Sequence, residues 1–175
     1  MLKLTLPSLI RGMNFRQLIL RANRFLGSSL VDKDLVQEGT LELANERLLE
    51  MFNEKPVSRP MLLEILIYEM QTLAEADYLD VLARGSPIGL IDLSRVAVHT
   101  PEGVTAEECR ATNTVVFDTM EQYHFLATTY YLSTPIREYW QERFSGSVQW
   151  FACSIASMNE QLESMQSDPP AVAAT

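Results

Sequence analysis

The sequence contains few of the residues that metal, disulfide and cofactor chemistry require. It has two cysteines, Cys109 and Cys153, and two histidines, His99 and His124, among 175 residues. Two distant cysteines do not form a disulfide framework, so we expect a reducing, cytoplasmic compartment. The sequence holds no phosphate-binding loop, zinc ligand set or Gly-x-Ser-x-Gly pattern. It therefore predicts no cofactor and favours a protein that is not an enzyme.

Long apolar runs are also missing. The longest uncharged run is too short to cross a bilayer, so we expect no transmembrane segment. The first residues lack the apolar core and small-residue site of a secretory signal. An arginine-rich start without acids is typical of an organelle transit peptide, but Pro7 and Gly12 interrupt a helix there. We therefore expect a soluble protein.

Acidic residues are absent from the first 30 positions and abundant afterwards. The chain has 14 basic and 23 acidic residues and a net charge of −9. Five of the basic residues lie in the first 30 positions, so the rest of the chain contains nine basic residues and all 23 acidic residues. Binding to phosphate backbones needs surplus Lys and Arg, so this acidic protein is not expected to bind nucleic acid.

Apolar spacing predicts an all-α fold. Apolar residues make up 47% of the chain, which suits one globular domain. Their repeats at three and four positions predict helices over 14–26, 40–53, 58–84, 105–133, 135–144 and 148–166. Residues 85–104 read as a long loop or small β-hairpin. We predict a single-domain helical bundle of five to six helices over 14–166, with an N-terminal arm at 1–13 and a disordered tail at 167–175.

The segment 105–133 is the expected centre of this bundle. It begins with a capping box from Thr105 to Glu108, and it carries more apolar residues than one helix face can hold. The last segment repeats apolar residues without interruption, which predicts a seam along another helix, formed by Val148, Phe151, Ile155, Met158, Leu162 and Met165.

One short pattern within 105–133 has metal-binding chemistry. Glu121 and His124 are spaced so that both reach one metal ion from a helix, as in di-iron bundles. Such a site needs a second pair, and the residues before His99 do not supply one. We therefore predict no metal site and keep Glu121 and His124 as candidates. A haem ligated by His124 is the related alternative, and Cys109 or Cys153 as a nucleophile is another.

Several large side chains lie where a helical pattern expects water. Trp, Tyr and Arg often anchor interfaces, so we predict a partner-binding surface made of Phe125, Leu132, Tyr139, Trp140 and Trp150. A second internal core layer is the alternative. The basic face of helix 14–26 adds Arg16, Arg21 and Arg24, which can contact the acidic remainder of the chain, an acidic partner or an anionic membrane.

The sequence therefore favours a non-enzymatic protein–protein interaction module: an adaptor, an assembly factor or a regulatory subunit. Its partner is expected to be another protein or further copies of this chain in an oligomer. A metal- or haem-binding helical oxidoreductase or sensor centred on His124 is one alternative. A peripheral membrane-surface protein that binds through residues 14–26 is the other.

Overall fold

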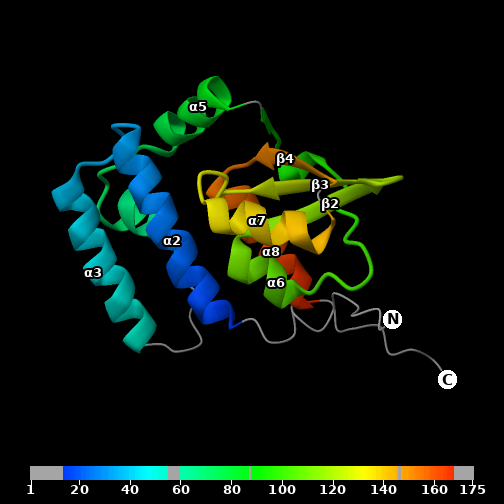
Figure 1. The fold of residues 1–175 in the computed structure, drawn as a ribbon, viewed down its shortest axis with the longest axis horizontal. Helices are drawn as coiled ribbons and strands as arrows, with labels where there is room; N and C mark the ends of the chain where they lie inside the picture. The colour runs from blue at the N-terminus through cyan, green and yellow to red at the C-terminus, as the bar shows by residue number, and fades with distance from the viewer. Residues whose placement is uncertain (1–13, 55–59, 87, 146, 168–175) are drawn as a thin grey trace, which may run out of the picture.

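Two long helices lie side by side at one edge of the molecule in the computed structural model, which describes residues 14–54, 60–86, 88–145 and 147–167 (Figure 1). They are α2 (Phe15–Asp32) and α3 (Glu38–Glu54). The Asn14 side chain accepts a hydrogen bond from the Arg16 N–H and caps α2. Both helices were predicted from apolar spacing. The predicted helix 40–53 is confirmed as α3, whereas α2 continues beyond the predicted end at residue 26. The predicted arm 1–13 lies outside the described residues, as does the tail beyond Ser167.

The second half of the chain forms a mixed sheet with helices packed against it. The sheet has four strands in the order β1-β4-β3-β2. Its strands are β1 (Gly89–Leu90), β2 (Thr114–Met120), β3 (Tyr123–Thr128) and β4 (Val148–Ala152). Strands β2 and β3 form an antiparallel hairpin, whereas β3, β4 and β1 run parallel.

Helices of differing length complete the structure. They are α4 (Leu62–Glu64), the π-helical turn η1 (Ile65–Glu69), α5 (Glu75–Gly85), the 3-10 turn η2 (Leu93–Arg95), α6 (Ala106–Thr112), α7 (Thr134–Arg143) and α8 (Ile155–Ser167). Helix α7 connects the parallel strands β3 and β4 as a crossover helix, and α2 packs against both α6 and α7. The predicted helix 135–144 corresponds to α7 and is confirmed.

This mixed α/β architecture corrects the predicted all-α bundle. The predicted central helix 105–133 is in fact α6 followed by the hairpin β2–β3. Its capping box is present, but the helix ends at Asn113, which has a left-handed conformation with a φ of 47°. Asn tolerates this conformation better than most residues, and Thr114-Val115-Val116-Phe117 then favours extended backbone.

Two other predicted helices are also divided. The predicted helix 148–166 is strand β4 followed by α8, with Ser154 between them accepting a hydrogen bond from the Ser157 N–H. The predicted helix 58–84 is interrupted at Gln71, which has a φ of 54°. In the predicted loop 85–104, only Gly89 and Leu90 form a strand, and this strand pairs with β4 rather than within a local hairpin.

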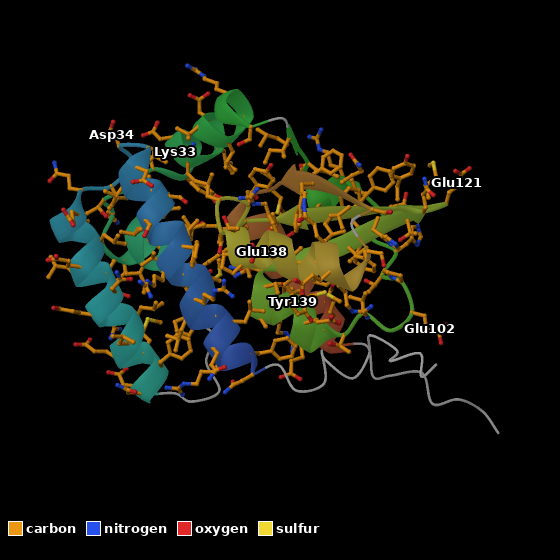
Figure 2. All side chains as sticks on the ribbon, in the orientation of Figure 1. Lys33, Asp34, Glu102, Glu121, Glu138 and Tyr139 are labelled. Atoms are coloured by element: carbon orange, nitrogen blue, oxygen red, sulfur yellow. The ribbon has the colours of Figure 1, made fainter. Side chains whose placement is uncertain are left out.

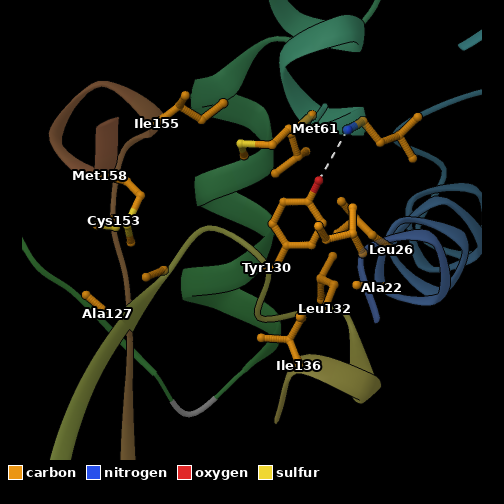
Figure 3. Close-up of a cluster of buried hydrophobic side chains, with 14 of the residues drawn as sticks. Ala22, Leu26, Met61, Ala127, Tyr130, Leu132, Ile136, Cys153, Ile155 and Met158 are labelled. Carbon is orange, nitrogen blue, oxygen red and sulfur yellow. Dashed lines mark hydrogen bonds between the residues drawn. The ribbon is translucent and has the colours of Figure 1, made fainter. Parts of the chain in front are cut away.

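The helical half and the sheet half share one hydrophobic core. Tyr130, two residues after β3, accepts a hydrogen bond from the Leu62 N–H through its hydroxyl oxygen (Figure 3). The same hydroxyl donates to Asn23 of α2. Ser133 donates to the Ala22 carbonyl oxygen across 2.9 Å. These bonds satisfy polar groups that would otherwise be costly to bury, and they connect α2, α4 and the chain after β3.

Candidate functional site: a groove and a protruding hairpin

An open groove of about 740 Å³ lies where the turn between α2 and α3 approaches Thr72. Its apolar wall comes from Val31, Leu35 and Val36. Its polar atoms belong to Asp34, Gln37, Glu38, Thr40 and Thr72. The amide and hydroxyl groups of this lining can donate hydrogen bonds, and its two carboxylates can accept them. The lining residues described include no Lys or Arg.

Two turns of similar construction meet at this groove. After α2 the chain turns at Asp34, with a φ of 56°, and the Leu35 N–H donates to the Leu30 carbonyl oxygen across 3.0 Å. After η1 it turns at Gln71, with a φ of 54°, and the Thr72 N–H donates to the Leu66 carbonyl oxygen across 2.9 Å. Each turn ends a helix with a left-handed residue and satisfies a carbonyl that the helix leaves free.

The arginines of α2 are exposed. Arg16 lies over the ring of Phe52 at 5.3 Å, and Arg21 lies over the ring of Phe25 at 5.6 Å. Arg24 precedes Val31 by seven residues and therefore projects from the groove side of α2. The apolar face of α2 is buried within the protein. The arginines, together with Phe25, whose exposed fraction is 40%, therefore remain for contact with an acidic partner or an anionic membrane.

The predicted surface of five large side chains does not form. Leu132, Tyr139 and Trp140 are buried within the chain itself, whereas Phe125 and Trp150 are partly buried. The Tyr139 hydroxyl donates to Glu108 across 2.7 Å, and the Trp140 indole donates to Thr112 across 3.1 Å. The internal core layer considered as an alternative therefore accounts for Leu132, Tyr139 and Trp140, and the partner surface predicted there is corrected accordingly.

The Glu121–His124 pair lies on a β-hairpin, where the helical spacing argument no longer applies. Glu121 is at the far tip of the hairpin (Figure 2). His124 stacks on Phe144 with ring centroids 3.9 Å apart, and its Nδ1 lies 3.2 Å from Thr119 Oγ1. Burial, and secondarily the charge of Arg143, lowers the pKa of His124. Among the described residues, no group of three or more potential metal ligands is present.

Both cysteines are buried. Burial raises the pKa of Cys109 to about 12 and that of Cys153 to about 12. The thiolate is the nucleophilic form of cysteine, so these environments strongly disfavour reaction of either side chain.

The hairpin tip is an exposed apolar site that the sequence interpretation missed. Met120 and Tyr123 are cross-strand partners beside the turn, with exposed fractions of 62% and 43%. The helical interpretation of 105–133 made this segment the packed centre of a bundle and therefore did not predict an exposed apolar tip. An extended interpretation would have paired them across the two-residue turn Glu121-Gln122.

Comparison with known proteins supports the fold. No family model and no curated protein matches the sequence. One solved structure, described as "Structure of MshE with cdg", resembles this chain with a TM-score of 0.51 and 18% sequence identity. The alignment covers 80% of this chain and 97% of that one. At this identity the likeness establishes a shared mixed α/β fold. Within the described residues, no helix is long and apolar enough to cross a membrane.

Proposed function

We propose that this chain is a non-enzymatic interaction domain that acts as an adaptor, assembly factor or regulatory subunit by binding another protein. The observation that carries this proposal is the exposed pair Met120 and Tyr123 at the hairpin tip. Met and Tyr are enriched in protein interfaces, where burial removes their apolar surface from water. The tip extends away from the helices, so a partner can reach it without rearrangement of the core (Figure 2).

Site-specific photocrosslinking tests this proposal. A photoreactive residue replaces Tyr123 in the full chain, and a matched protein carries it at Gln141, an exposed position on α7. We expect a discrete protein adduct at position 123, which disappears when Met120 is changed to Ser. Mass spectrometry of the adduct separates a second copy of this chain from another protein. Equal, diffuse labelling at both positions would contradict the proposal.

Binding of c-di-GMP in the groove is a second candidate function. One observation favours it: the structural neighbour described above was solved with this dinucleotide. The lining is less favourable, because Asp34 and Glu38 would face a dianionic ligand. Lys33 is exposed and directly precedes the lining residue Asp34, so it is the basic residue best placed to offset this repulsion (Figure 2).

Calorimetry with c-di-GMP tests this candidate directly. If the groove binds the dinucleotide, Lys33→Ala should weaken binding by about tenfold or more, because charge-assisted contacts to phosphate are strong. Arg84→Ala, which removes an exposed arginine of α5, should leave binding unchanged. The absence of binding heat at high protein and ligand concentration would exclude this function, and equal losses in the two variants would place binding outside the groove.

A further inference from the structure

Three partly exposed side chains gather where the beginning of α7 approaches β4. The Arg137 guanidinium lies over the Tyr131 ring at 5.0 Å, and the Tyr131 and Trp150 rings meet edge to face at 6.3 Å. Arg137 Nη2 also donates to Thr134 Oγ1 across 3.2 Å. We refer to Tyr131, Arg137 and Trp150 as the Arg137 cluster. It is distinct from both the groove and the hairpin tip.

The Arg137 cluster contains two buried donors that lack acceptors. Arg137 Nε and Trp150 Nε1 are both covered, and neither finds a hydrogen-bond partner within the part of the chain that is described. Arg137 also forms no ion pair with a described Asp or Glu, although acidic residues outnumber basic ones in this protein. A covered donor without an acceptor is costly.

We propose that the Arg137 cluster binds a carboxylate group, with Arg137 Nε and Trp150 Nε1 as donors. A carboxylate supplies both the negative charge that Arg137 lacks and two oxygens for two donors. The planar guanidinium suits a planar carboxylate because several N–H groups point in fixed directions. All three side chains are partly exposed. Binding requires the guanidinium to move from its position over the Tyr131 ring, because both donor atoms are covered.

The indole N–H resonances provide a test with an internal reference. The chain has two tryptophans, and the Trp140 indole already donates to Thr112 Oγ1. We would titrate full-length, ¹⁵N-labelled protein with acetate and with N-acetylglutamate amide, and use N-acetylglutamine amide and sodium chloride as matched controls. The expected result is a saturable downfield shift of the Trp150 indole signal with the two carboxylates alone, while the Trp140 signal stays in place.

Two variants separate binding from folding. Arg137→Gln removes the charge and should weaken the carboxylate affinity about tenfold or more. Arg95→Gln, at an exposed arginine on η2, should leave it unchanged. The Trp140 signal and the dispersion of the backbone spectrum report whether each variant is folded. Trp150→Phe keeps an aromatic ring against Tyr131 and removes the N–H, so it should weaken acetate binding to the Arg137 signals.

Four outcomes would overturn the proposal. The Trp150 signal could be insensitive to both carboxylates, as expected if ordered water satisfies the donors. It could respond equally to chloride or to the glutamine amide, which would indicate ionic strength or non-specific contact. It could keep its response in folded Arg137→Gln. Tighter binding of inorganic phosphate than of acetate would also reject a carboxylate as the ligand class.

Discussion

The helical half and the sheet half differ in how well their secondary structure can be predicted from the sequence. In residues 14–54, apolar side chains repeat at helical spacing because α2 and α3 each bury one face. In residues 114–128, strands β2 and β3 contain consecutive buried residues. Strands covered on both faces lose the alternation that identifies a strand. Short apolar runs of this kind are therefore easily assigned to helices.

The largest expected change in stability comes from opening a cavity in the sheet half. Trp140 is fully buried, and Trp140→Ala should lower the free energy of unfolding by about 3–5 kcal/mol. Leu26→Ala, at a fully buried position of α2, is the matched change in the helical half and should cost about 2–5 kcal/mol. Urea denaturation followed by circular dichroism measures both.

Because Tyr130 connects the two halves through Asn23 and Leu62, each variant should shift one shared unfolding transition. Two separate transitions, each sensitive to only one of the variants, would mean that the halves unfold independently.

Much of the helical half could be predicted from sequence, while the topology of the sheet half could not. The Asn14 cap, the capping box at Thr105 and the helices α2, α3 and α7 follow local rules. The end of α6 depends on Asn113 adopting a left-handed conformation, and the parallel pairing of β3 with β4 depends on distant residues. No local pattern specifies such pairing, because its stability comes from burial across the whole sheet.

The candidate sites were predictable only in part. Trp150 and the arginines of α2 were identified as contact residues from their positions on expected helices. Trp150 in fact lies on a strand, so its contact with Tyr131, which also carries Arg137 over its ring, was not foreseen. The groove depends on left-handed turns at Asp34 and Gln71, and neither turn contains the glycine that usually marks this conformation.

Smaller changes in stability are expected from two glycine substitutions within the helical half, and these changes should have opposite signs. A Cβ atom added at Gly27 of α2 would lie 2.7 Å from a methyl group of Leu41 and 3.2 Å from one of Leu62. Gly27→Ala should therefore destabilise the protein by about 1 kcal/mol, since crowding outweighs the helix propensity of alanine. Gly39 on α3 has nothing within 4 Å. Gly39→Ala should stabilise by about 0.5–1 kcal/mol, because glycine loses more backbone entropy on folding.

Thermal or urea unfolding of both glycine variants measures whether each substitution stabilises or destabilises the protein. Stabilisation by both substitutions would show that α2 can move away from α3 and α4 without cost. The close helix packing seen at Gly27 would then contribute little to the stability of this half.

The smallest effect concerns His124 in the sheet half. Burial against Phe144, with the nearby charge of Arg143, lowers its pKa below the ordinary value of 6.5. The unfolded chain therefore binds a proton at a higher pH than the folded chain does. The stability that neutral His124 provides is complete above pH 6.5 and declines as the pH falls through the folded pKa.

His124→Gln keeps a planar group beside Phe144 and removes the titration, so unfolding of the variant should depend less on pH below neutrality. The direct measurement is the pH dependence of the His124 ring proton signal, whose midpoint should lie below 6.5. A midpoint above that value would mean that a favourable contact of the charged ring, such as its stacking on Phe144, outweighs the effect of burial.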